Sequence, residues 1–108
     1  MERLCFLMHL VPGMEAEYEK RHDEIWLDMQ AAVVAAGFRN YTLFRRGTQV
    51  IGYAECVPDI ATVLSAMGAH EVNTRWGESL STVIASMTDE TGDLIRYTEV
   101  WQLDESAS

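Results

Sequence analysis

Two side chains capable of proton transfer lie one helical turn apart near the start of the chain. Tyr18 and His22 fall within residues 14–36, whose residue types favour a helix that ends at Gly37. At about 3.6 residues per turn, both belong to one apolar stripe, so a phenol and an imidazole face the core together. An imidazole titrates close to neutral pH and can accept or donate a proton. The functional interpretation of this spacing is a pocket between helix and sheet, lined by a group that titrates near neutrality.

A structural role is the commoner explanation for residues in such positions. Buried tyrosine and histidine side chains usually hydrogen-bond to nearby carbonyl groups, here those of a sheet. Trp26 lies slightly further round the same helix and suits either core packing or a flat wall for a sugar. Tyr41, at the start of a predicted strand, and Trp76, in a predicted helix, are equally ordinary as core or interface residues. Helix geometry alone leaves both interpretations open.

Other chemistries lack the residues they need. His9 and His70 have no partner at metal-ligand spacing, so we predict no metal site. Cys5 and Cys56 lie in apolar, strand-like segments, where a cysteine is usually a reduced and buried thiol. The sequence also contains no glycine-rich phosphate loop and no nucleophile elbow. Any enzymatic activity is therefore predicted to need no cofactor.

Six predicted elements position these residues. They are a strand over residues 4–11, a helix over 14–36, strands over 38–46 and 49–57 joined by a tight turn, a helical stretch from 58 to about 85 broken near Gly68, and a strand over 95–103 that follows a polar loop at 88–93. This order predicts an α+β, ferredoxin-like βαββαβ fold, in which helices cover one face of an antiparallel four-stranded sheet. The 108 residues are predicted to form a single domain, residues 1–108.

The second face of such a sheet has no helix to cover it. Leu7 and Val11 on the first strand, Thr98 and Val100 on the last, and the apolar segment 50–57 make this face unsuited to water. Two copies packed sheet against sheet would bury it. We therefore predict a homodimer of the dimeric α/β-barrel type.

The charge of the chain restricts its partners. Seventeen acidic residues against eight basic ones give a formal net charge of -9, which opposes binding to nucleic acid and to anionic membranes. The first apolar run is shorter than a bilayer span, and no basic segment with a cleavage site accompanies it. A cytoplasmic location is expected.

Short motifs spread over residues 3–103 are shared with one known family. They are Phe6-Leu7-Met8, Glu17-Tyr18, Arg21-His22, Ile25-Trp26, Ala36-Gly37, Asn40-Tyr41, Tyr53, Glu55, Arg75-Trp76 and Glu99-Val100-Trp101. With these motifs the chain resembles the L-rhamnose mutarotase family. The most specific element is the cluster of Tyr18, Arg21, His22 and Trp26 followed by Asn40-Tyr41.

The resemblance implies a ferredoxin-like dimer that interconverts the α and β anomers of L-rhamnose or a related free pyranose. It places His22 at the position of the proton donor, and Tyr18, Tyr41 and Trp76 at positions that bind the sugar. Two departures stand out. Gly77 occupies a position where the family usually has a second tryptophan, which leaves the identity of the sugar open, and Leu27-Asp28 replaces a proline and glutamate pair.

The chemistry of anomer exchange agrees with these residue types. Opening the sugar ring requires a proton on the ring oxygen and removal of another from the anomeric hydroxyl, which an imidazole can transfer with help from Tyr18 or a water. The same fold also serves cofactor-free monooxygenases and haem-binding proteins, for which His22 or His70 would be the candidate axial ligand. A sugar-binding module without activity is a third possibility.

Overall fold

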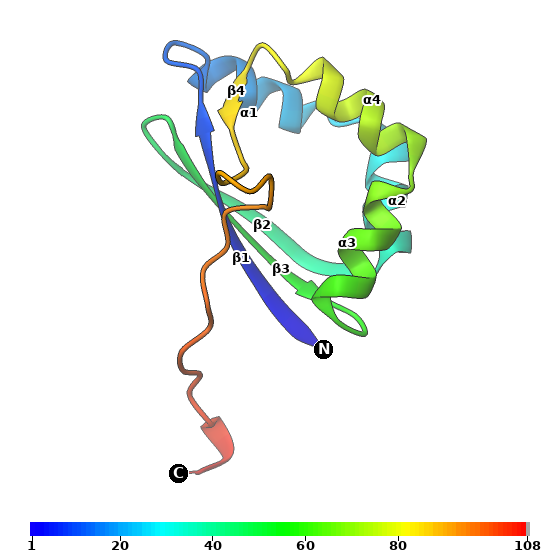
Figure 1. The fold of residues 1–108 in the computed structure, drawn as a ribbon, viewed down its shortest axis with the longest axis vertical. Helices are drawn as coiled ribbons and strands as arrows, with labels where there is room; N and C mark the ends of the chain where they lie inside the picture. The colour runs from blue at the N-terminus through cyan, green and yellow to red at the C-terminus, as the bar shows by residue number, and fades with distance from the viewer. Residues whose placement is uncertain (108) are drawn as a thin grey trace.

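The computed structural model describes residues 1–107, which form one antiparallel sheet with α-helices on one side of it (Figure 1). The elements in chain order are β1 (Glu2–Leu10), α1 (Glu15–Asp23), α2 (Leu27–Ala36), β2 (Phe38–Arg46), β3 (Gln49–Cys56), α3 (Ile60–Gly68), α4 (Glu71–Ser79), β4 (Ile84–Ser86) and the short 3-10 helix η1 (Glu105–Ala107). None of the helices within residues 1–107 has the length and apolar character needed to cross a membrane.

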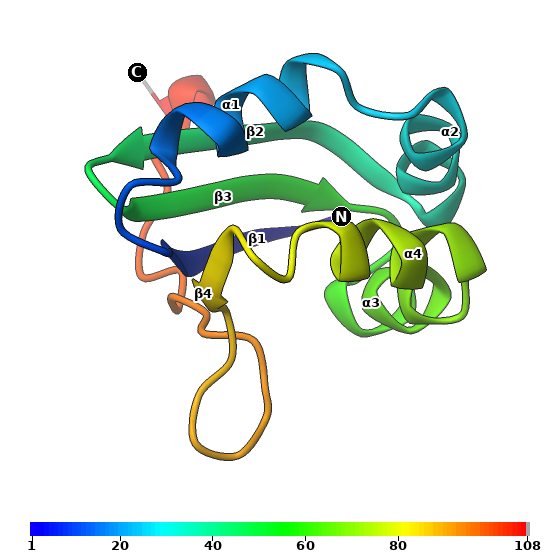
Figure 2. The same cartoon turned by 90° about the horizontal axis from the view of Figure 1, so that it is seen from above.

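The sheet has the strand order β2-β3-β1-β4, and every neighbouring pair is antiparallel. Figure 2 shows this order, with α1 above β2 and the other helices at one end of the strands. The hairpin of β2 and β3 turns at Gly47, as its sequence predicts, where φ is +60°. The predicted ferredoxin-like α+β fold is therefore confirmed.

Alternate residues of the two central strands form the floor of the core. A strand turns successive side chains to opposite faces, and the helix-facing set is buried while the other set is not. The buried set comprises Leu4, Phe6, Met8, Leu10, Val50, Ala54 and Cys56. Gly52 lies in the same row, where a Cβ would come within 2.2 Å of the Phe6 ring. Because Gly52 has no side chain, the Phe6 ring can pack over the backbone at this position.

The prediction of one continuous helix over residues 14–36 is wrong. The helix α1 ends at Asp23, Trp26 has extended backbone angles (φ −61°, ψ 138°), and α2 begins after it. Residues 27–36 are apolar almost all round, so they pack against α3 and α4 instead of continuing along the sheet. The predicted end at Gly37 is confirmed, with φ at +113°.

The second helical stretch is shorter than predicted. The predicted break near Gly68 is present, since α3 ends there and α4 begins at Glu71. The predicted end at about residue 85 is wrong, because α4 ends at Ser79. The following residues bury Leu80 and Val83 and then reach the free edge of β1, which the β-branched pair Val83 and Ile84 favours.

The last strand was predicted over residues 95–103, and this is also wrong. The sheet is closed by β4, after which the chain returns beside β1 for residues 95–97 only: the Leu7 N–H donates to the Ile95 carbonyl (2.9 Å) and the Tyr97 N–H to that of Cys5 (2.9 Å). Beyond this point Glu99 still forms an ion pair with Arg3, but the tail then extends away from the sheet, as Figure 1 shows in orange and red, and Val100 is 91% exposed. A strand needs a neighbour, and the tail has none within residues 1–107.

The sheet face away from the helices carries an apolar row flanked by polar side chains such as Arg3, His9 and Glu55. Phe44, Ile51 and Leu7 pair across β2, β3 and β1 and form a row on this face. Phe44 is 61% exposed, so this apolar row is in contact with solvent in the monomer. Val50 instead lies on the helix side, and Val11, Thr98 and Val100 lie outside the named strands, which corrects part of the predicted face.

Candidate active site

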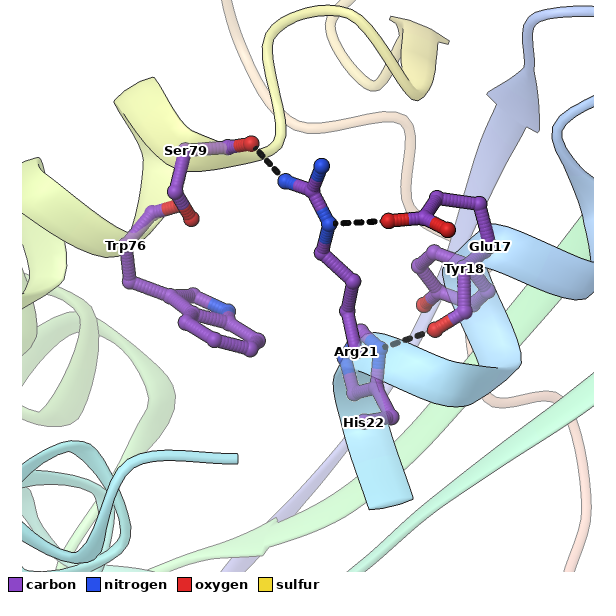
Figure 3. Close-up of polar contacts among 6 residues, drawn as sticks. All are labelled: Glu17, Tyr18, Arg21, His22, Trp76 and Ser79. Carbon is purple, nitrogen blue, oxygen red and sulfur yellow. Dashed lines mark hydrogen bonds and ion pairs between the residues drawn. The ribbon is translucent and has the colours of Figure 1, made fainter. Parts of the chain in front are cut away.

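Four aromatic rings from α1, α4 and the residue before α2 form a connected chain between the helices. The Tyr18 and His22 rings of α1 have centroids 4.4 Å apart. The His22 ring meets Trp76 of α4 edge to face at 5.5 Å, and Trp76 meets Trp26, which precedes α2, at 5.1 Å. In Figure 3, Trp76 of α4 lies opposite the α1 residues Tyr18 and His22, with Arg21 between them in this view. The residues that the sequence singled out from both helical regions therefore lie together.

His22 is held so that one ring nitrogen is available. Its Nδ1 lies 3.1 Å from the backbone carbonyl oxygen of Tyr18. Because a carbonyl only accepts, Nδ1 carries the proton and Nε2 of the neutral ring has a free lone pair. Burial lowers the pKa of His22, although the bond to the Tyr18 carbonyl opposes this effect. The imidazole is accordingly neutral at pH 7 and can accept a proton at Nε2.

Tyr18 brings a buried hydroxyl that lacks a partner. The residue is only 3% exposed, and its oxygen has no hydrogen bond to any of residues 1–107. Leaving such a group unpaired costs about 1–3 kcal/mol, so a ligand hydroxyl at this point would gain that amount. Burial, reinforced by the nearby Tyr41 hydroxyl, raises the pKa of Tyr18. Tyr18 therefore remains a neutral phenol that can donate and accept hydrogen bonds.

A bulge in β2 turns Tyr41 toward the helices. Between Arg39 and Thr42 the strand has one residue more than β3, and Asn40 takes a left-handed φ of 51°. The Tyr41 ring then packs edge to face against Phe38 (5.2 Å) and Phe6 (6.1 Å). Although 41% of the residue is exposed, burial of its hydroxyl raises the pKa. Tyr41 thus presents a second neutral phenol close to that of Tyr18.

A cleft of about 260 Å³ opens between α1 and α4. It is lined by Glu17, Lys20, Arg21, Glu24, Trp26, Trp76 and Ser79. Trp76 therefore lines the cleft and also contacts His22, whereas Tyr18, His22 and Tyr41 are not among the lining residues. The cleft therefore lies beside His22 and shares Trp76 with the aromatic chain.

Sequence reasoning missed what three residues contribute to this arrangement. Phe6 and Phe38 hold the Tyr41 ring, and only the alternation of their strands could have pointed to them. Arg21 belongs to a shared motif, but nothing in the sequence reveals its bond to the Ser79 carbonyl. Among residues 1–107, no three His, Cys, Asp or Glu side chains are grouped to hold a metal ion.

Known sequences match this chain over nearly its whole length. The profile of one family, described as L-rhamnose mutarotase, matches residues 3–103. The chain belongs to the L-rhamnose mutarotase family. The L-rhamnose mutarotase of Oceanobacillus iheyensis is 32% identical over 106 residues, which is 96% of this chain and 100% of that protein. The L-rhamnose mutarotase of Listeria monocytogenes is 31% identical over 105 residues, covering 95% and 99% of the two chains.

A solved structure agrees on the fold. The crystal structure of an L-rhamnose mutarotase from Formosa agariphila aligns with a TM-score of 0.77, covers 96% of this chain and 100% of its own, and is 19% identical. Membership of the L-rhamnose mutarotase family confirms the resemblance inferred from the motifs. It supports a mutarotase over the monooxygenase and haem-binding alternatives that the same fold allows.

Proposed function

We propose that this member of the L-rhamnose mutarotase family interconverts the α and β anomers of L-rhamnose or a related free pyranose, with His22 as the general acid/base. One observation carries the proposal at residue level: a neutral imidazole with a free Nε2 lies between a buried, unpartnered phenol and an indole. Such a group can move protons near neutral pH, and the two neighbours suit a sugar.

The proposed reaction consists of proton transfers that open the sugar ring and close it again. Nε2 of His22 takes the proton of the anomeric hydroxyl, the bond between the anomeric carbon and the ring oxygen breaks, and the ring oxygen takes up a proton. The open aldehyde rotates about its bond to C2, and the same transfers in reverse close the ring with the other configuration. A phenol such as Tyr18, or a water, serves as the second proton carrier. Atoms and charge balance without any redox step.

Binding is assigned to the groups around the imidazole. The hydroxyls of Tyr18 and Tyr41 would pair with sugar hydroxyls, because both are buried and neutral. Trp76 and Trp26, which meet edge to face at the cleft, would offer apolar surface to the C–H groups of the ring. The net charge of -9 fits an uncharged sugar in the cytoplasm better than nucleic acid or a membrane surface.

Gly77 is predicted to loosen the choice of sugar. It follows Trp76 on α4, and a Cβ built there meets nothing within 4 Å, so the position borders open space. One missing apolar contact is worth about 1–3 kcal/mol in discrimination. We expect the wild type to accelerate anomer exchange of L-rhamnose, L-fucose and L-mannose with similar kcat/KM, and Gly77→Trp to favour one of them. The measurement is saturation-transfer NMR across these sugars, with Gly77→Ala as control; sharp selectivity of the wild type for L-rhamnose would refute the prediction.

The uncovered sheet face supports a homodimer as part of the proposal. Two copies packed through the row of Phe44, Ile51 and Leu7 would remove it from water, and the exposed Trp101 of the tail would lie at or near the same interface. Light scattering at micromolar concentration should then give twice the chain mass of 12.2 kDa. Phe44→Glu should shift the mass to that of one chain, and Trp101→Ala should lower the melting temperature.

The matched control for the interface is Val34→Glu on α2, where an equally exposed apolar residue lies on the helix side of the molecule. It should leave the dimer intact. A wild-type mass near 12.2 kDa, or an intact dimer for Phe44→Glu, would contradict this interface.

A further inference from the structure

The helix that carries Tyr18 and His22 is held in place mainly by side chains. Close packing joins α2 to α3 and α4, whereas α1 packs closely against none of these helices. Apart from the buried Tyr18 and the contact of His22 with Trp76, two arginines tie α1 to its surroundings. Arg45 on β2 pairs with Glu19 at 2.6 Å, and Arg21 reaches across the cleft to α4. The position of His22 relative to α4 therefore depends on few contacts.

Arg21 joins the two helices on which the aromatic chain depends. Its Nε donates to Oε1 of Glu17 at 2.8 Å, and its Nη1 donates to the backbone carbonyl of Ser79, the last residue of α4 (Figure 3). The last carbonyls of a helix have no partner within it and carry its partial negative charge, so a guanidinium there is favourable. Arg21 thus caps α4 from α1.

Both ends of this bridge lie within a turn of a proposed site residue. Arg21 directly precedes His22, and Ser79 follows Trp76 by one helical turn, with its hydroxyl donating to the Trp76 carbonyl at 2.7 Å. Glu17 holds the guanidinium from its other side, and this ion pair lowers the pKa of Glu17. The bridge therefore connects the turn that carries the imidazole to the turn that carries the indole.

We propose that Arg21 is a positioning residue that fixes the separation between His22 and Trp76 by capping α4 from α1. The consequence for activity rests on the proposed function, whereas the consequence for the structure does not. A sugar placed against Trp76 would lie close to the imidazole because the two ring centroids are 5.5 Å apart. Small displacements of a reacting group cost roughly 10- to 100-fold in rate. Loss of the bridge should accordingly lower kcat more than it raises KM.

The test compares three variants for kcat, KM, melting temperature and dimer mass. Arg21→Ala should lower kcat about 10-fold or more with a smaller change in KM. Arg21→Lys should recover part of the loss, because an ammonium keeps the charge but lacks the planar fork that serves Glu17 and Ser79 together. Arg45→Ala, the matched control, removes the other ion pair of α1 and leaves the bridge to α4, so its kcat should match the wild type.

A second readout does not depend on activity. In a Trp26→Phe, Trp101→Phe background, Trp76 is the sole tryptophan, and acrylamide quenching of its fluorescence reports its exposure. Arg21→Ala should raise the quenching constant while Arg45→Ala leaves it unchanged. This result would stand even if the wild type had no mutarotase activity.

Equal kcat and equal quenching for Arg21→Ala and the wild type would overturn the proposal, as would equal losses in Arg21→Ala and Arg45→Ala. If Arg21→Ala does not fold, the Arg21→Lys variant tests the proposal in its place. A kcat reduced about 3-fold or more at near-normal KM supports the positioning role of Arg21, and a wild-type kcat refutes it.

Discussion

His22→Gln is expected to reduce the enhancement of anomer exchange by about 100-fold or more, while the protein stays folded and keeps much of its affinity for the sugar. The loss is the usual scale for removing a positioned acid/base group. The glutamine amide can still donate to the Tyr18 carbonyl that now holds Nδ1 at 3.1 Å, so the local structure is preserved. The amide cannot gain or lose a proton near neutral pH, so the substitution tests catalysis separately from sugar binding.

Controls for this substitution come from the same site and from a second histidine. Tyr18→Phe and Tyr41→Phe remove hydroxyls assigned to binding, so KM should rise first, with a milder effect at saturating sugar. His70→Gln changes a histidine at the start of α4 whose side chain makes no capping bond, and it should behave as the wild type. A His22→Gln protein that is folded, dimeric and fully active would exclude the mechanism and make Tyr18 the next candidate for the acid.

Gly37→Ala is expected to destabilise the fold by about 3 kcal/mol or more, the combined scale of overpacking and backbone strain. Gly37 ends α2 at φ +113°, and a Cβ there would lie 2.3 Å from the carbonyl oxygen of Val57 and 2.9 Å from Cγ2 of Val63. The backbone cannot easily move away, because the Gly37 carbonyl accepts a hydrogen bond from the Val57 N–H at 3.0 Å. The melting temperature should fall by roughly 10 °C or more.

The matched control for Gly37 is Gly68, which ends α3 with helical geometry and open space around its Cα. Gly68→Ala should be neutral or stabilise by up to about 1 kcal/mol, because alanine favours the helix. Both variants are compared by thermal unfolding at one protein concentration, since a dimer melts in a concentration-dependent way. Equal melting temperatures for Gly37→Ala and the wild type would contradict the crowding described for this position.

Much of the fold could be predicted because local patterns and the global structure agree. The β2 and β3 hairpin, the stop at Gly37 and the break at Gly68 follow from turn residues and alternation. The break at Trp26 could not be predicted, because it depends on α2 burying its apolar surface against α3 and α4, which are distant in sequence. The strand-like tail was misplaced for a related reason, since pairing requires a free edge that the sequence does not reveal.

The candidate site, like the fold, could be predicted only in part from the sequence. The one-turn spacing of Tyr18 and His22 placed them on one face from sequence alone, and their rings are indeed in contact. Tyr41 and Trp76 were assigned to the sugar-binding site only through the resemblance to the L-rhamnose mutarotase family. The Tyr41 side chain turns toward the helices because of the bulge at Asn40. The bond of Arg21 to Ser79 joins residues far apart in the chain, so only the structure shows it.

The central claim, that His22 carries the proton in anomer exchange, is tested most directly by saturation-transfer NMR on L-rhamnose. Saturating one anomeric proton and following loss of signal at the other gives the exchange rate at equilibrium, with wild type, His22→Gln and buffer compared at matched protein and sugar concentration. We predict a rate well above buffer for the wild type and a rate close to buffer for His22→Gln. Equal rates for the two proteins would contradict the account.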